Sequence, residues 1–176
     1  LASGQASVGT GTARWKLAIL VSALIGVGVV TALTVNQKYS NKAMGLVLHQ
    51  RLQAGEPVYM LKKYIYDLPF YAQLKQPVRV VDDWAQAKLN KNDNWQHELM
   101  DAAEFNSAVG SKALVQVNAL KPQLCAGSVS WLVGRSEVVK EFPFLAQAEQ
   151  VFAQHGLVLW RIDGRALGAG VCTTGN

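Results

Sequence analysis

The sequence contains little cysteine and little charge. Two of its 176 residues are Cys, so at most one intramolecular disulfide can form, and a small disulfide-rich scaffold is excluded. Charged residues make up 16% of the chain and hydrophobic residues 50%, a composition that excludes an acidic disordered tail and a collagen-like repeat. The fold must therefore rest on a buried core or on a membrane.

Charge is absent altogether from Leu17 to Gln37, where a few Ser, Gly and Thr interrupt an aliphatic run. As a helix, Leu17 to Val35 would be about 30 Å long, the thickness of the hydrocarbon core of a bilayer. A fully buried helix needs a larger domain around it, and the apolar region of a cleavable signal peptide is usually about 7–15 residues long. We predict a transmembrane helix over residues 15–37, with Trp15 and Tyr39 as interfacial anchors.

The rest of the chain consists of three segments that differ in composition. Residues 1–14, rich in Gly, Ser, Ala and Thr, are predicted to be a flexible loop, and residues 164–176 a flexible tail. Residues 38–163 are long enough to bury roughly two thirds of their unfolded surface and are predicted to form one domain. The chain starts with Leu1 instead of Met, as expected for a fragment of a larger protein.

Short apolar runs alternate with helical patterns along this domain. The predicted strands are Val58–Lys62, Val78–Val81, Leu114–Val117, Val129–Val133 and Leu157–Ile162. The predicted helical segments are one capped by Ser40 and ended by Gly55, Leu68–Leu74 capped by Asp67, one opened by an Asp93/Gln96 capping box, Asn118–Cys125, and Phe144–His155 stopped by Gly156. This alternation is typical of parallel strands with crossover helices. We predict an α/β fold: one transmembrane helix followed by a three-layer α/β domain with a mostly parallel sheet.

Few residues suggest bound metals or cofactors. His49, His97 and His155 lack metal-ligand spacing, and a place for His155 in the last turn of a helix is explained by the helix dipole. We expect no metal, no cofactor and no nucleic-acid partner. Cys125 and Cys172 are expected to be unpaired thiols, with a disulfide as the alternative in an oxidising compartment.

Two segments combine aromatic rings with carboxylates where the chain leaves a predicted strand. In open α/β sheets ligands gather at the carboxyl ends of strands, and proteins grip sugars with aromatic faces and carboxylates. The alternative is ordinary packing of Phe70 and Trp84, with Asp67 and Asp82 as helix caps. The predicted substrate-binding residues are Tyr66, Asp67, Tyr71, Asp82, Asp83 and Trp84.

The same region carries a family resemblance. The motifs Asp67–Tyr71, Pro77–Trp84 and Asp93–Trp95, with Trp131–Val133 and Leu159–Arg161 further on, are similar to a known C-terminal region. It resembles that of bacterial inner-membrane GT-C type glycosyltransferases, the relatives of the lipid A aminoarabinose transferase and the dolichyl-phosphate-mannose protein mannosyltransferases.

The resemblance implies the C-terminal part of an integral membrane enzyme of the bacterial inner membrane, with its soluble domain in the periplasm. Such enzymes move a sugar from a polyprenyl-phosphate carrier to a lipid or protein acceptor, for example in lipid A modification. Their catalytic carboxylate lies in a loop that this chain does not contain, so no residue here is assigned a catalytic role and the fragment alone is expected to be inactive. The implied partners are membrane lipid, the polyprenyl-phosphate-sugar donor and the remaining transmembrane part of the parent enzyme.

A second hypothesis belongs to a different class. The chain would be a single-span envelope protein whose α/β domain binds a ligand or partner and catalyses nothing. The number of apolar spans encoded upstream of Leu1 discriminates between the two hypotheses.

Overall fold

The computed structural model describes residues 9–35, 40–90, 94–127, 129–167 and 172. The chain forms two compact units, Leu1–Ser40 and Asn41–Asn176.

The first unit is one long apolar helix, α1 (Gly9–Val35). Its stretch Arg14–Thr34 has a mean hydropathy of 2.4, and in length and composition it is the one described helix suited to cross a membrane. Its large apolar side chains are exposed throughout, which is unfavourable in water. The hydroxyl groups of Thr31 and Thr34 donate to carbonyls of the same helix, so these polar groups do not need water. The predicted long apolar helix is confirmed, although it begins at Gly9, within the segment expected to be a loop.

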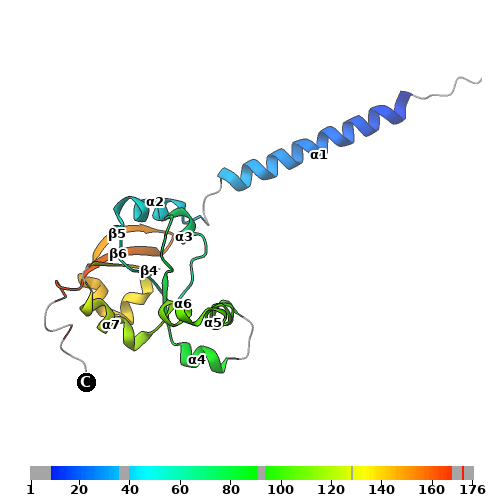
Figure 1. Cartoon of the computed structure of the whole chain (residues 1–176). Coiled ribbons are helices and arrows are strands. Elements are labelled where there is room, and N and C mark those ends of the chain that lie inside the picture. Colours follow the sequence, from blue (N-terminus) through cyan, green and yellow to red (C-terminus); the bar gives the residue numbers. More distant parts are fainter. Residues whose placement is uncertain (1–8, 36–39, 91–93, 128, 168–171, 173–176) are drawn as a thin grey trace, which may run out of the picture. The chain divides into compact units, whose positions relative to one another are not determined.

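The second unit is built on a six-stranded sheet of order β3-β2-β1-β4-β6-β5. Strands β4, β6 and β5 of this sheet lie side by side in Figure 1. Strands β1, β2, β3 and β4 are parallel to one another. At one edge of the sheet, β6 pairs antiparallel with β4, and β5 pairs antiparallel with β6. The bounds are β1 Val58–Leu61, β2 Arg79–Asp82, β3 Leu114–Gln116, β4 Val129–Arg135, β5 Glu149–Gln154 and β6 Leu157–Asp163.

Helices cover both faces of the sheet. Their bounds are α2 Lys42–Arg51, α3 Leu68–Tyr71, α4 Trp84–Leu89, α5 Trp95–Phe105, α6 Ser107–Ala113 and α7 Val117–Ala126, with the 3-10 helices η2 Ser136–Lys140 and η3 Pro143–Gln147. All four residues of β1 are buried: Val58 and Met60 pack with α2–α5, and Tyr59 and Leu61 with α7, η2 and η3. The predicted three-layer α/β fold with a mostly parallel sheet is confirmed.

Two predicted helix caps differ from the structure. Asn41 is the cap residue of α2, so the assignment to Ser40 is wrong. The cap of α5 is Asn94, whose side chain accepts from the N–H groups of Gln96 and His97; Asp93 lies outside the described residues. Short helices α4 and α6 are additional to the predicted elements, and each has a side-chain cap.

The predicted helix Phe144–His155 is wrong: its first residues lie in the 3-10 helix η3, and β5 follows, paired in a hairpin with β6, the predicted strand Leu157–Ile162. His155 and Gly156 connect the two strands, and both have a left-handed backbone, with φ of 51° and 77°. Two consecutive residues with positive φ make the turn type that best matches the twist of a hairpin. His155 is therefore a turn residue, and no helix dipole explains it.

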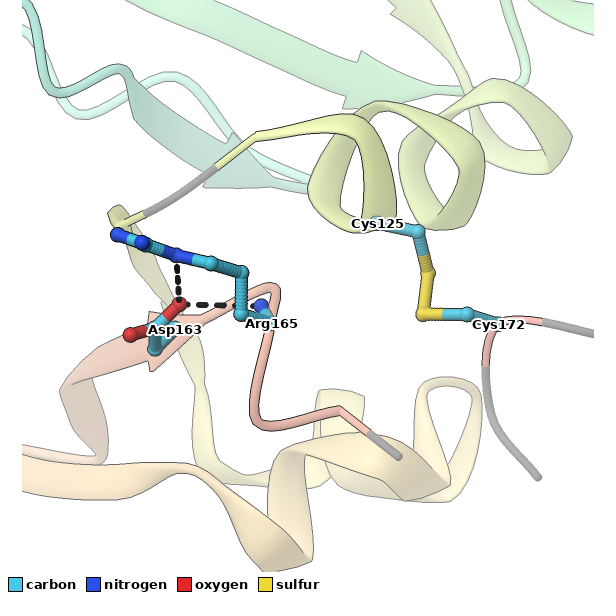
Figure 2. The surroundings of a disulfide bond; sticks show 4 residues. All are labelled: Cys125, Asp163, Arg165 and Cys172. Carbon is cyan, nitrogen blue, oxygen red and sulfur yellow. Dashed lines mark hydrogen bonds and ion pairs between the residues drawn. A yellow bond between two sulfur atoms is a disulfide. The ribbon is translucent and has the colours of Figure 1, made fainter. Parts of the chain in front are cut away.

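The expected pair of free thiols is also wrong: Cys125 on α7 is bonded to Cys172 across a sequence separation of 47 (Figure 2). Within the segment expected to be a flexible tail, Leu167 is buried in the core. A Cβ at Gly164 would lie 1.9 Å from the Leu124 carbonyl oxygen, so only glycine lets this segment pass the end of α7. This part of the C-terminal segment is thus fixed to the domain.

Candidate functional site at the carboxyl edge of the sheet

The sheet reverses its strand order between β1 and β4. The chain runs from β1 outward to β2 and β3, and then returns to place β4 on the other side of β1. In open α/β sheets, ligands bind in the crevice outside the carboxyl ends of the strands at such a switch point. The residues that follow β1, β2 and β4 therefore form the first candidate site.

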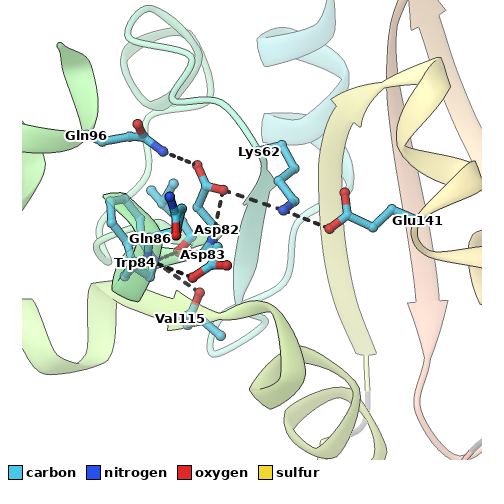
Figure 3. A network of polar contacts seen from close by, with 9 residues as sticks. Lys62, Asp82, Asp83, Trp84, Gln86, Gln96, Val115 and Glu141 are labelled. Atoms are coloured by element: carbon cyan, nitrogen blue, oxygen red, sulfur yellow. Dashed lines mark hydrogen bonds and ion pairs between the residues drawn. The ribbon is translucent and has the colours of Figure 1, made fainter. Parts of the chain in front are cut away.

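Lys62 follows β1 directly and joins the two sides of this switch point. Its Nζ lies 2.7 Å from Glu141 Oε1, beyond β4, and 3.6 Å from Asp82 Oδ1, at the end of β2 (Figure 3). The backbone of Lys62 is left-handed, with φ of 58°, and its N–H donates to the Val81 carbonyl at 2.9 Å. This backbone conformation costs about 1–2 kcal/mol outside glycine, so the surrounding structure holds the backbone of Lys62 against local strain.

The carboxylates of Glu141 and Asp82 favour the charged form of the Lys62 ammonium group. Burial lowers the pKa of Lys62, but the hydrogen bond and charge of Glu141, together with the charge and hydrogen bond of Asp82, outweigh it and raise the pKa above the ordinary 10.5. Lys62 is therefore a cation at neutral pH, and it lies between two carboxylates. We name Lys62, Asp82 and Glu141 the carboxyl-edge cluster.

Asp82 is the buried member of the carboxyl-edge cluster, with 7% of its surface exposed. Its Oδ1 accepts from the Asp83 N–H and its Oδ2 from Gln96 Nε2, each at 2.8 Å. A buried carboxylate is stable only when its oxygens are hydrogen-bonded in this way. Asp82 therefore positions Lys62, and the more exposed Glu141 is the carboxylate that a ligand can reach.

Asp83 and Trp84 follow Asp82 but differ in environment. Asp83 is exposed and caps α4 by accepting from the Gln86 N–H at 3.0 Å. Trp84 is only 6% exposed; its Nε1 donates to the carbonyls of Val80 and Val115, at 3.2 and 3.1 Å. The Trp84 ring packs in the core, so the packing alternative describes it better than sugar stacking.

Of the remaining predicted site residues, Tyr66 and Asp67 lie between β1 and α3, and Tyr71 is the last residue of α3. Tyr66 is 60% exposed, and its hydroxyl donates to Glu98 at 2.9 Å, a bond that, as the largest cause, raises the tyrosine pKa. Asp67 accepts from the backbone N–H and side-chain amide of Asn41, at 2.9 and 2.8 Å, and makes no cap bond to α3. Tyr71 is half-buried, and its ring packs edge-on against Phe70.

The first turn of α5 brings only some of these residues together. Gln96 binds Asp82, Glu98 binds Tyr66, and the ring of Trp95 packs edge-on against Trp84. Asp67 bonds instead to the start of α2, and the Cβ of Tyr71 lies against Gly45 of that helix. Asp82, Asp83, Trp84 and Tyr66 therefore share one region, whereas Asp67 and Tyr71 stabilise the packing of α2 on α3.

A cavity of about 500 Å³ adjoins the carboxyl-edge cluster. Glu141 belongs to the carboxyl-edge cluster and also lines this cavity. The rings of Phe142 and Phe144, which follow Glu141 in the chain and also line the cavity, pack edge-on against each other with centroids 6.0 Å apart. The other polar groups of the lining are Asn118 and Lys121 on α7 and Gln147 on η3. A carboxylate, amides and aromatic rings suit a polyhydroxylated ligand. No three His, Cys, Asp or Glu side chains in the described part of the chain are grouped to hold a metal ion.

Lys62, Gln96 and Glu141 are not among the predicted substrate-binding residues. The position of Lys62 directly after a buried strand was a usable signal, since strand ends are where ligands gather. The role of Glu141 could not be predicted in this way, because its contact with Lys62 depends on β4 lying beside β1.

The sequence matches no protein-family model and no curated protein. The fold is similar to crystal structures of ArnT from Cupriavidus metallidurans, one bound to undecaprenyl phosphate and one in the apo state. In both comparisons the TM-score is 0.54 and the identity 17%, over 78% of this chain. The chain spans 21–22% of the length of those structures, so the likeness is to one part of ArnT and shows the fold.

Proposed function

We propose that the chain is the C-terminal part of an integral membrane glycosyltransferase that moves a sugar from a polyprenyl-phosphate carrier to a lipid or protein acceptor. The observation that supports this proposal most is the fold likeness to ArnT over 78% of the chain. The long apolar helix α1, which precedes the α/β domain, agrees with the expected last transmembrane helix. The remaining transmembrane part of the parent enzyme carries the catalytic residues.

The domain acts by positioning. A folded domain beside the active-site cavity of the parent enzyme excludes water and orients the acceptor, which accelerates transfer without bond making. Glu141, Asp83, Lys62 and Tyr66 offer charged and hydroxyl groups to the acceptor. Asp82 and Trp84 hold these groups in place, whereas Asp67 and Tyr71 stabilise the packing of α2 on α3.

The proposed compartment is the periplasmic side of the bacterial inner membrane. Structural disulfides persist mainly in oxidising compartments such as the bacterial periplasm. The bond between Cys125 and Cys172 is therefore compatible with that side of the membrane.

The experiment measures sugar transfer by the full gene product in proteoliposomes. We expect Glu141→Gln to raise the KM for the acceptor about tenfold, since a charge-assisted hydrogen bond contributes about 1.5–3 kcal/mol. Glu137→Gln is the matched control, because Glu137 is an exposed carboxylate on η2 outside the cluster. Absence of transfer by the unmodified gene product refutes the enzymatic assignment, and equal KM values for all three proteins refute the acceptor surface.

A single-span binding protein is the second candidate. It is favoured by a cavity of about 610 Å³ at the edge of the sheet opposite the carboxyl-edge cluster. A start codon close to Leu1, without further apolar spans upstream, would establish this candidate and exclude the transferase.

A further inference from the structure

Among the described residues of the α/β domain, Phe105 is the most exposed large apolar side chain. It is the last residue of α5 and is 95% exposed. The other large apolar side chains of α5, Trp95, Leu99 and Met100, are half-buried against the core. A single exposed ring is common on protein surfaces, so its meaning depends on whether the molecule also offers a site that fits it.

The corner between α5 and α6 presents this ring in a fixed position. Asn106 caps α6 by accepting from the Val109 N–H at 3.4 Å. A Cβ at Gly110 would collide with the carbonyl oxygen of Ala103, so only glycine lets α6 pack this closely on α5. The two helices lie beside each other in Figure 1. Phe105 therefore projects from a packed corner of the domain.

An apolar cavity of about 610 Å³ adjoins the same corner, at the amino edge of the parallel strands. We name it the amino-edge cavity. Its walls come from α6, from the end of α2 and from the segments that lead into β1 and β2. The larger apolar residues of the lining are Leu52, Pro57, Leu74, Pro77 and Val109. Known small-molecule sites occupy about 300–1,000 Å³, so the cavity has ample room for an aromatic ring.

The amino-edge cavity also carries positive charge. Lys75 and Lys112 are exposed members of its lining, and neither forms an ion pair with a described residue. The carboxylate of the lining, Glu56, is engaged, because its Oε2 accepts two hydrogen bonds. The guanidinium of Arg79 is bonded to Tyr59 on the other face of the sheet and does not contribute. The cavity therefore combines apolar walls with two ammonium groups.

The corner that carries Phe105 has the opposite charge. Glu104 directly precedes Phe105, and Asp101 lies one helical turn before it. Both carboxylates are exposed, and neither forms an ion pair with a described residue. An apolar ring beside carboxylates complements an apolar cavity beside ammonium groups. Both surfaces belong to this chain, so the partner that fits is a second copy of it.

We propose that two copies of the chain associate by inserting the Phe105 ring of each into the amino-edge cavity of the other. Glu104 of each copy then meets Lys75 and Lys112 of its partner. Ala108, in the lining, is three residues from Phe105, so one copy presents ring and cavity together and a two-fold axis satisfies both contacts at once. This interface goes beyond the proposed function and lies at the opposite edge of the sheet from the carboxyl-edge cluster.

The experiment measures the molar mass of the full chain in mild detergent by analytical ultracentrifugation at several protein concentrations. We expect a monomer–dimer equilibrium whose dissociation constant rises at least about tenfold in Phe105→Ser, since a symmetric dimer loses two aromatic anchors. Leu89→Ser is the matched control: Leu89 is 74% exposed, lies on α4 outside the cavity, and its loss should leave dimerisation unchanged. Circular dichroism verifies folding, which substitutions at exposed positions should preserve.

A charge exchange tests the cavity side of the interface. We expect Glu104→Lys to weaken the dimer about three- to tenfold, because it places like charges together. Adding Lys75→Glu or Lys112→Glu to this variant should restore the affinity. A monomeric unmodified chain overturns the proposal, as does a dimer that Phe105→Ser leaves intact, because association then depends on α1 or on another surface. Failure of both exchanges to restore the dimer refutes the amino-edge cavity as the docking site.

Discussion

Replacement of Trp84 separates a structural role from a ligand-binding role. The side chain is 6% exposed, belongs to the core between the sheet and helices α2–α5, and packs edge-on against Trp95 at a centroid distance of 6.1 Å. Substitution of a buried Trp by Ala costs about 3–5 kcal/mol. We therefore expect Trp84→Ala to lower the free energy of unfolding by about that amount.

The substitution Trp84→Phe tests how much the indole N–H contributes to stability. This group donates to the carbonyls of Val80 and Val115, on adjacent strands β2 and β3. The net value of one such hydrogen bond is about 1 kcal/mol, and the smaller ring leaves unfilled volume worth roughly as much again. The expected loss is about 2 kcal/mol.

The measurement is urea denaturation of the full chain in mild detergent, followed by circular dichroism because the substitution removes a fluorophore. Leu89→Ala is the matched control: Leu89 lies on the same helix and is 74% exposed, so its loss should stay under about 0.5 kcal/mol. Asp83→Asn should be equally mild, since Asn caps a helix as well as Asp does. A loss below about 1 kcal/mol for Trp84→Ala, or one equal to that of Leu89→Ala, contradicts the structural role.

Three further predictions concern the disulfide, the ammonium group of Lys62 and helix α1. Joint replacement of Cys125 and Cys172 by Ser should lower the unfolding free energy by about 4 kcal/mol, from the separation of 47 residues. Dithiothreitol should destabilise the unmodified chain equally and leave this variant unchanged; no effect on either protein contradicts the bond. The raised pKa of Lys62 gives stability that is complete below the unfolded value of about 10.5 and is lost as the pH rises through the higher folded value. Denaturation between pH 9 and 12 should therefore show a smaller decline for Lys62→Met than for Lys63→Met, and equal declines refute this linkage. After carbonate extraction the full chain should remain with the membrane, whereas a chain that starts at Asn41 should be soluble and unfold cooperatively; recovery of the full chain in the aqueous fraction refutes the membrane assignment.

Local patterns were sufficient to predict most elements of the domain. The run at Val58 was predicted as a strand because a strand buried on both faces has no polar alternation. The same logic failed at residues 149–154, where β5 lies at the edge of the sheet and its side chains are exposed or half-buried. There the periodicity resembles a helix, and the better signal was the dipeptide His155-Gly156, which suits a tight hairpin turn.

The candidate site was predictable only where it depends on chain neighbours. Asp82 and Asp83 could be selected because they end a strand, a property that the local sequence contains. The contact between Lys62 and Glu141 depends on β4 lying beside β1, which is set by the hydrophobic burial of the whole sheet. Burial also decided the role of Trp84, since an aromatic residue after a strand suits either a core or a ligand. A carboxylate whose partner is distant in sequence therefore becomes recognisable as a site residue only after the strand order is known.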